Sequence, residues 1–265
     1  MPDDVAYMQR ALELAALGTG RTFPNPLVGA VVVSGGSIVG EGFHAAAGGP
    51  HAEVNALAIA GSAAAGGTLY INLEPCCHHG RTPPCSALIA RTGIRRVVFS
   101  ILDPDPRVLG RGARALREMG IETATGLLAR EALELNLPYA HSRLTGRPFI
   151  ALKLALTLDG RLGGRRRGRF TCEQSLLLVH ELRARMEAIA VGRGTLTADD
   201  PELDRRRYPR PLPPPLRMVF DSSLRFPAGH RWLERGERVI LYCAEGVSGD
   251  RREELRAAGA EVVAL

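Results

Sequence analysis

The chain has 265 residues, of which 45% are hydrophobic and 23% charged, as is typical of a globular protein with room for two domains. Its formal net charge of +6 suits an anionic partner, while an aromatic share of 5% argues against a protein that stacks single-stranded nucleic acid. No basic and apolar leader opens the sequence and no apolar run is long enough to cross a bilayer, so we expect neither a signal peptide nor a membrane partner.

Hydrophobic periodicity predicts an α/β domain over residues 1–145, in which strands alternate with helices on the faces of an open sheet. Asp3 and Asp4 open a first helix that Gly18 stops, and the segment GAVVVSGGSIVGEG is typical of a two-stranded hairpin. The remaining predicted elements are, in order, a helix from about His51 to Gly61, a strand over Thr68–Leu73, a helix opened by Pro83 and Pro84, a strand over Arg95–Ile101, a helix over Gly110–Glu118, a strand in IETATG and a helix over Ala129–Ala140.

A second α/β domain is predicted over residues 146–265, after a linker at residues 145–148. It begins with PFIALKLAL, which we expect to form a long apolar strand. The later predicted elements are a helix from about Glu173 to Arg185, a buried strand in AIAVG, a helical turn around Thr195–Ala198, strands in RMVFD and RVILYC, a helix over Gly249–Ala258 and a strand in EVVAL.

The chemistry of the chain concentrates between residues 51 and 85, where one histidine and two cysteines have the spacing of a zinc site. His51, Cys76 and Cys85 offer three ligands and leave the fourth position of a tetrahedral ion open, as catalytic zinc requires. Glu53 follows the histidine by two residues and is expected to move protons rather than to bind metal. The pattern H-x-E, followed by P-C and a second cysteine, is the signature of zinc-dependent deaminases of amino-heterocycles.

A closed structural zinc site is the alternative, with Cys77, His78 or His79 as its fourth ligand. We favour catalysis, because Glu53 has no role in a structural site. Eight residues separate the two cysteine ligands, whereas cytidine and tRNA-adenosine deaminases generally have two. This insert, CHHGRTPP, contains the cation Arg81 and is suited to a polar, phosphorylated substrate.

Longer motifs run through most of the chain. They are TFPNPLVG (Thr22–Gly29), HAE (His51–Glu53), LEPCCHHGRTPPC (Leu73–Cys85), DPDPRVLGRG (Asp103–Gly112) and LKLALTLDGR (Leu152–Arg161). Together they resemble the family of bifunctional riboflavin-biosynthesis deaminase/reductases. The resemblance implies a cytidine-deaminase-like three-layer domain, followed by a dihydrofolate-reductase-like α/β domain.

The family's activities, if carried over, make this chain an enzyme of riboflavin biosynthesis. The first domain would hydrolytically deaminate 2,5-diamino-6-ribosylamino-4(3H)-pyrimidinone 5′-phosphate, and the second would reduce the ribosyl group to ribityl with NADPH. By the same resemblance, zinc is held by His51, Cys76 and Cys85, protons are moved by Glu53, and the deaminase substrate is contacted by Asn25, His44, His78 and Arg81. In the second domain the resemblance implies that Ala155, Thr195 and Asp199 line the NADPH site, and that Lys153, Arg183, Leu203 and Arg206 face the reductase substrate.

Two features depart from the family's pattern. Residues 163–170 read GGRRRGRF, where the family usually has a Ser-Gly-rich segment with a tryptophan. We interpret this segment as a basic loop, and the alternative is a loop that binds the 2′-phosphate of NADPH. The family's reductase domain also continues past the length of this chain, so a partial reductase domain is predicted. The alternative function is therefore a deaminase whose reductase domain is inactive.

The expected partner is a small phosphorylated pyrimidine rather than nucleic acid, and RNA binding through the arginine runs is the competing hypothesis. We also expect a homo-oligomer. The five cysteines are odd in number and three of them cluster, which argues against a disulfide framework and favours the reducing cytoplasm.

Overall fold

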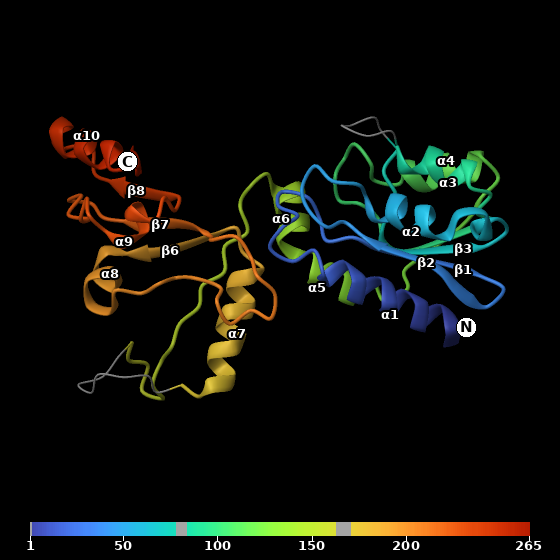
Figure 1. Cartoon of the computed structure of the whole chain (residues 1–265), viewed down its shortest axis with the longest axis horizontal. Helices are drawn as coiled ribbons and strands as arrows, with labels where there is room; N and C mark the ends of the chain where they lie inside the picture. Colours follow the sequence, from blue (N-terminus) through green and yellow to red (C-terminus); the bar gives the residue numbers. More distant parts are fainter. Residues whose placement is uncertain (1, 78–83, 163–170) are drawn as a thin grey trace. The chain divides into compact units, whose positions relative to one another are not determined.

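The computed structural model describes residues 2–77, 84–162 and 171–265 (Figure 1). Its internal contacts divide the chain into two compact units, Met1–Lys153 and Leu154–Leu265, and each is described by itself.

The first unit is built on a five-stranded mixed sheet. Its strands are β1 (Gly29–Ser34), β2 (Ser37–Phe43), β3 (Thr68–Leu73), β4 (Arg96–Ile101) and β5 (Glu122–Thr125), and they lie in the order β2-β1-β3-β4-β5. β1 is antiparallel to both of its neighbours, while β3, β4 and β5 are parallel. Every strand predicted for this domain is confirmed, including the hairpin that turns between β1 and β2.

Helices cover both faces of this sheet and make three layers, as expected (Figure 1). α1 (Pro2–Ala16) packs on one face and α2 (Ala52–Ala60) on the other. Alternation along β1 explains both contacts, because Val31 and Val33 meet Met8 on α1, whereas Ala30 and Val32 face the layer that contains α2. The other helices of these layers are α3 (Cys85–Arg91), α4 (Arg111–Glu118) and α5 (Ala129–Leu135).

Glycines on β2 let α2 approach the sheet closely. A Cβ on Gly40 would lie 2.2 Å from the carbonyl oxygen of Ala56, and one on Gly42 would lie 2.5 Å from the Ala56 nitrogen. Any larger residue at either position would therefore push the helix away from the strand. This close packing fixes the start of α2, where His51 and Glu53 lie.

The helix predicted over Ala129–Ala140 is instead two helices, α5 and α6 (Leu137–Thr145), which meet at Asn136. The buried Asn136 side chain accepts a hydrogen bond from the Leu27 N–H at 2.7 Å and donates one to the Leu27 carbonyl at 2.9 Å. Pro138, in the first turn of α6, has no N–H with which to continue the α5 ladder. The break thus ties the α5–α6 junction to the turn that precedes β1.

The second unit contains a four-stranded parallel sheet. The strands β6 (Ala188–Gly192), β7 (Leu216–Phe220), β8 (Val239–Cys243) and β9 (Glu261–Ala264) lie in that order, and the helices are α7 (Glu173–Ala184), α8 (Arg193–Asp199), α9 (Arg231–Glu234) and α10 (Gly249–Ala257). Its core includes Val219 and Leu241 from the central strands, together with Trp232 from α9, a helix that the sequence pattern did not predict.

Two predictions for this unit were wrong. PFIALKLAL is not a strand, and its side chains Ile150 and Leu152 are each 82% exposed. A strand requires a hydrogen-bonded neighbour, and within the described residues no strand pairs with this segment. β6 was expected to be buried but is only half-buried, because it is an edge strand of the described sheet.

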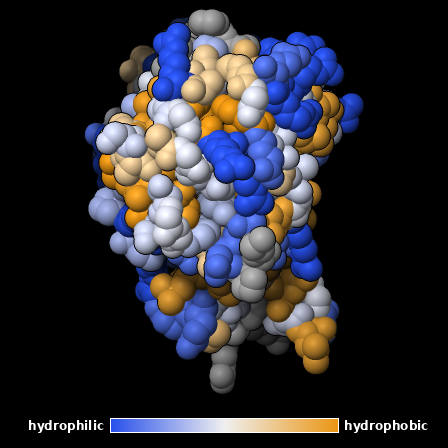
Figure 2. Space-filling model, turned by 90° about the vertical axis from the view of Figure 1, so that its right-hand side faces the viewer, coloured by the Kyte–Doolittle hydropathy of each residue, from blue (hydrophilic) through white to orange (hydrophobic). Residues whose placement is uncertain are grey.

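Apolar exposure elsewhere is scattered. On the face shown in Figure 2, hydrophobic and hydrophilic side chains are interspersed, as on most globular proteins. Among the described residues, no helix has the length and apolar character that a membrane span needs.

Candidate active site

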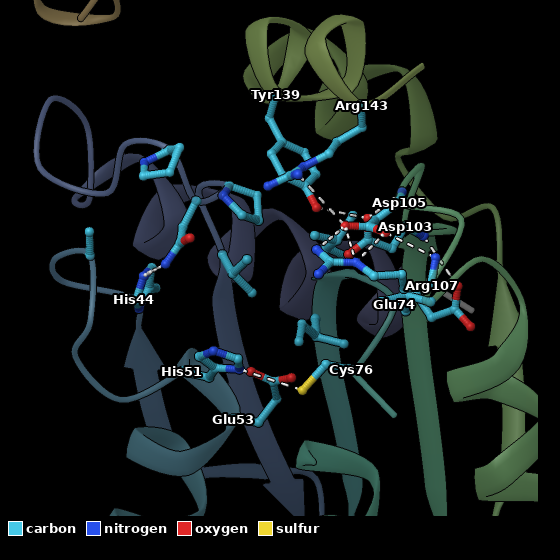
Figure 3. Close-up of a pocket in the computed structure, with 18 of the residues that line it drawn as sticks. His44, His51, Glu53, Glu74, Cys76, Asp103, Asp105, Arg107, Tyr139 and Arg143 are labelled. Atoms are coloured by element: carbon cyan, nitrogen blue, oxygen red, sulfur yellow. Dashed lines mark hydrogen bonds and ion pairs between the residues drawn. The ribbon is translucent and has the colours of Figure 1, made fainter. Parts of the chain in front are cut away.

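A cavity of about 370 Å³ opens where β3 and β4 end in the first unit (Figure 3). Ligands of open α/β sheets commonly bind at the carboxyl ends of parallel strands. The lining residues come mainly from the turn before β1, the segment between β2 and α2, the start of α2, the segments after β3 and β4, and helix α6. Elements that are far apart in sequence therefore meet around one space.

The predicted zinc ligands converge at this cavity. The metal-binding atoms of His51, Cys76 and Cys85 lie within 4.8 Å of one another. The His51 Nδ1 atom is 3.2 Å from the Cys85 Sγ and 3.7 Å from the Cys76 Sγ. Ligand atoms around a tetrahedral zinc lie about 3.6 Å apart, so the three residues fit this ion. Among the described residues, no fourth ligand is grouped with them.

Local structure places each of these ligands. His51 immediately precedes α2, Cys76 follows β3 and Cys85 is the first residue of α3. The backbone N–H of Cys85 donates to the Cys76 sulfur at 3.3 Å. Hydrogen bonds from the Cys85 and His51 side chains lower the pKa of the Cys76 thiol well below its ordinary value, which favours the thiolate form that binds a cation.

Glu53 lies in the first turn of α2 and lines the same cavity. Its side chain is almost fully buried, and burial raises the pKa of its carboxyl group. Figure 3 shows the carboxylate beside His51 and Cys76. A carboxylate at this place can exchange protons with a group in the cavity.

Asn25 and His44 form a pair in the cavity wall. The Asn25 Nδ2 and His44 Nε2 atoms are 3.1 Å apart, and the His44 Nδ1 atom is 2.9 Å from the Pro50 carbonyl oxygen. A carbonyl only accepts, so Nδ1 carries the proton and Nε2 accepts from the Asn25 amide. Both ring nitrogens of His44 thus have partners within the chain, and the Asn25 amide is fixed with its Nδ2 towards His44.

The wall formed by the segment after β4 and by α6 is rich in charge. Arg107 donates to both carboxylate oxygens of Asp105, with a shortest distance of 2.6 Å, and lowers the pKa of that carboxyl to about 2. The Tyr139 hydroxyl donates to Asp103 at 2.9 Å. The Arg143 guanidinium lies 5.2 Å from the centre of the Tyr139 ring. All five residues line the cavity.

None of these five residues has a role predicted from the sequence. Asp103, Asp105 and Arg107 belong to DPDPRVLGRG, so their place in a family motif was the available signal. Tyr139 and Arg143 had no signal, because they reach the cavity only through the α5–α6 break.

Glu74 joins the zinc segment to the charged wall. Its buried carboxylate accepts the backbone N–H groups of Asp103 at 3.2 Å, Gly110 at 2.9 Å and Ala113 at 2.9 Å. One side chain, two residues before Cys76, therefore organises the entire segment between β4 and α4.

Replacing Glu74 with glutamine is expected to lower the free energy of unfolding of the first unit by roughly 2–4 kcal/mol. The amide keeps one acceptor oxygen but turns an NH₂ group towards buried N–H donors, and hydrogen bonds to charged groups are worth about 1.5–3 kcal/mol each. Urea denaturation monitored by circular dichroism measures the change. Glu118→Gln, on the exposed end of α4, is the matched control. Equal stability of the two variants would contradict this role.

In the second unit, three predicted residues gather around Asp204. Arg183 donates to the Asp204 carbonyl at 3.1 Å and Arg206 to its carboxylate at 2.7 Å. Leu203 is adjacent and has a positive φ of 50°. The predicted cofactor residues Thr195 and Asp199 lie exposed on α8, whereas Lys153 and Ala155 lie in the extended segment that forms no strand. His78, Arg81 and the segment Gly163–Phe170 lie outside the described residues.

Comparisons with known proteins agree with both units. Residues 1–101 match the family model of the cytidine and deoxycytidylate deaminase zinc-binding region, and residues 148–265 match that of the RibD C-terminal domain. Riboflavin biosynthesis protein RibD of Bacillus amyloliquefaciens is 42% identical over 262 residues, which cover 98% of this chain and 70% of that protein.

Two solved structures extend the similarity to the fold. RibD of Acinetobacter baumannii is 36% identical with a TM-score of 0.89, over 100% of this chain and 74% of the other. The diaminohydroxyphosphoribosylaminopyrimidine deaminase/5-amino-6-(5-phosphoribosylamino)uracil reductase of Thermotoga maritima is 36% identical with a TM-score of 0.85, over 98% and 80%. The expected order of domains is confirmed, and the chain belongs to the RibD family, which joins a zinc-dependent deaminase domain to an NADPH-dependent reductase domain.

Proposed function

We propose that the first domain hydrolytically deaminates 2,5-diamino-6-ribosylamino-4(3H)-pyrimidinone 5′-phosphate in riboflavin biosynthesis, using His51, Cys76 and Cys85 to hold zinc. The observation that carries the proposal is the grouping of these three ligands at a cavity that His51, Cys76 and Glu53 line. Zinc in this position supplies the Lewis acidity that makes water nucleophilic near neutral pH.

Glu53 moves the protons of this reaction. Its carboxylate accepts a proton from the attacking water as the new C–O bond forms at the ring carbon. It then returns a proton to the amino nitrogen, so that the C–N bond breaks and ammonia leaves. Burial of Glu53 keeps bulk water from exchanging with the proton in transit.

Asn25, held by His44, presents its remaining amide oxygen to the substrate, and we assign both residues to substrate recognition. His78 and Arg81 are proposed to contribute from the insert between the two cysteine ligands. The small-molecule partner is thus read by hydrogen-bonding groups fixed before it binds.

In the second domain we propose that Ala155, Thr195 and Asp199 contact NADPH, which supplies a hydride. The strand β6 ends at Gly192, and the helix α8 begins at the next residue, Arg193. The space beside this turn is open, because a Cβ added to Gly192 or Gly194 would meet no atom within 4 Å. An open strand-to-helix turn at the carboxyl end of a parallel strand is a common place for a nucleotide. Lys153, Arg183, Leu203 and Arg206 are proposed to face the reductase substrate.

Ammonia release from the phosphorylated substrate by zinc-loaded protein tests the first activity, and NADPH oxidation with the deaminated product tests the second. We expect both, and we do not favour a deaminase alone, because residues 148–265 match the reductase model. Failure of zinc-loaded protein to release ammonia would refute the deaminase assignment, and failure to oxidise NADPH would refute the reductase assignment.

We also propose a cytoplasmic homo-oligomer. The five cysteines form no disulfide in the structure, in keeping with a reducing compartment. Light scattering after size-exclusion chromatography measures the mass of the assembly, and a monomeric mass would contradict the oligomer.

A further inference from the structure

Arg143 is a cation with unused donors in the wall of the deaminase cavity. Among the described residues it makes no hydrogen bond, and its ion pair with Asp105 is long, at 3.9 Å. Its side chain is 34% exposed and lines the cavity. A guanidinium has five N–H donors in a planar fork that matches two oxygens of a phosphate.

The neighbouring Arg107 differs from Arg143, because its donors are already bound to a carboxylate. It donates three hydrogen bonds to the two carboxylate oxygens of Asp105, at 2.6 to 3.2 Å. This pair cancels its own charge, so Asp105 does not oppose an anion that approaches Arg143. Asp103, the other aspartate of this wall, accepts the Tyr139 hydroxyl. Among the described residues, Arg143 is therefore the cation of this wall whose donors no carboxylate holds at hydrogen-bond distance.

Tyr139 holds Arg143 in place. Its ring stacks with the guanidinium at 5.2 Å from the centroid, and its hydroxyl is anchored on Asp103 at 2.9 Å. Both residues lie on α6, one turn apart, and Figure 3 shows them extending from that helix towards Asp105. A cation fixed in this way loses less side-chain entropy when it binds a ligand.

The zinc ligands His51 and Cys76 lie at a different wall of the cavity from Arg143 (Figure 3). The substrate has a matching arrangement, because its reacting ring and its phosphate are attached at opposite ends of the ribose. We propose that Arg143, among the described residues of the deaminase cavity, binds the substrate's 5′-phosphate, an inference that rests on the proposed function. Arg143 then sets specificity for phosphorylated over unphosphorylated pyrimidines.

Deamination kinetics test the proposal, because ammonia release reports on the first domain alone. Arg143→Gln is expected to lower kcat/KM for the phosphorylated substrate roughly tenfold to a hundredfold, mainly through KM, since a charge-assisted hydrogen bond is lost. Activity on the dephosphorylated substrate should not change. Arg143→Lys should recover part of the loss, because it keeps the charge without the planar fork.

Arg130→Gln is the matched control, since Arg130 is 85% exposed, pairs with Glu134 and does not line the cavity. An equal loss on both substrates in Arg143→Gln, or no loss on either, would overturn the proposal. Titration calorimetry with ribose 5-phosphate adds a readout that does not need turnover. Identical isotherms for wild type and Arg143→Gln would overturn the role of Arg143, whereas absent ammonia release would overturn the deaminase function itself.

Discussion

Glu53→Gln is expected to retain about one zinc per chain while deamination falls by at least roughly 10²–10⁴-fold. Glutamine has nearly the same shape as glutamate and fits the same buried site at the start of α2. Its amide cannot accept a proton from water or return one to the leaving nitrogen. Metal analysis together with ammonia release measures both halves of this expectation.

Glu118→Gln removes a carboxylate from an exposed position and serves as the control for charge. The informative quantity is kcat, because Glu53 is proposed to act on protons in transit rather than on substrate affinity. A Glu53→Gln protein with normal kcat would show that another group moves the protons.

Loss of a zinc ligand is expected to have the second large effect. Loss of a residue that only hydrogen-bonds to a metal ligand typically weakens metal binding by about tenfold to a hundredfold. Cys85→Ser removes a ligand itself, so it should weaken zinc binding by more than roughly a hundredfold. It should therefore be purified with little zinc and release little ammonia. The serine hydroxyl is a poor substitute, because it is not ionised at neutral pH and is a harder ligand than a thiolate.

Cys77→Ser offers a closely matched control. Cys77 is adjacent to a zinc ligand, but within the described part of the chain its sulfur has only a weak 3.9 Å contact with the Arg107 carbonyl. This variant should keep its zinc and its activity. Loss of zinc from Cys77→Ser would instead support the closed, structural type of site that has a fourth protein ligand.

The zinc site was predictable because its information is local in the sequence. His51 and Glu53 are two residues apart, and Cys76 lies three residues after the end of a recognisable strand. The three layers were also predictable, since β1 and α1 show clear periodicities. The DPDPRVLGRG motif pointed to the segment after β4, but the chemistry of its individual side chains depends on partners from elsewhere.

The rest depended on contacts that sequence patterns do not encode. Pro138 was a local sign of the α5–α6 break, but the break is held in place by one amide, Asn136, which bonds to a residue 109 positions earlier. The positions of Tyr139 and Arg143 in the cavity wall depend on that break, because both residues lie on α6. The failed strand prediction at PFIALKLAL has a related cause, because an apolar alternating segment becomes a strand only where a neighbouring strand can pair with it.

The bond between Asn136 and Leu27 also bears on how the first domain could be shortened or recombined. A fragment that ended after β5 would retain the complete sheet and every zinc ligand, and by those criteria would count as an intact deaminase core. It would nevertheless lack the part of the cavity wall that α6 supplies, Tyr139 and Arg143. Such a fragment would be expected to bind metal well and to discriminate poorly among substrates, so the useful boundary for domain exchange lies after α6.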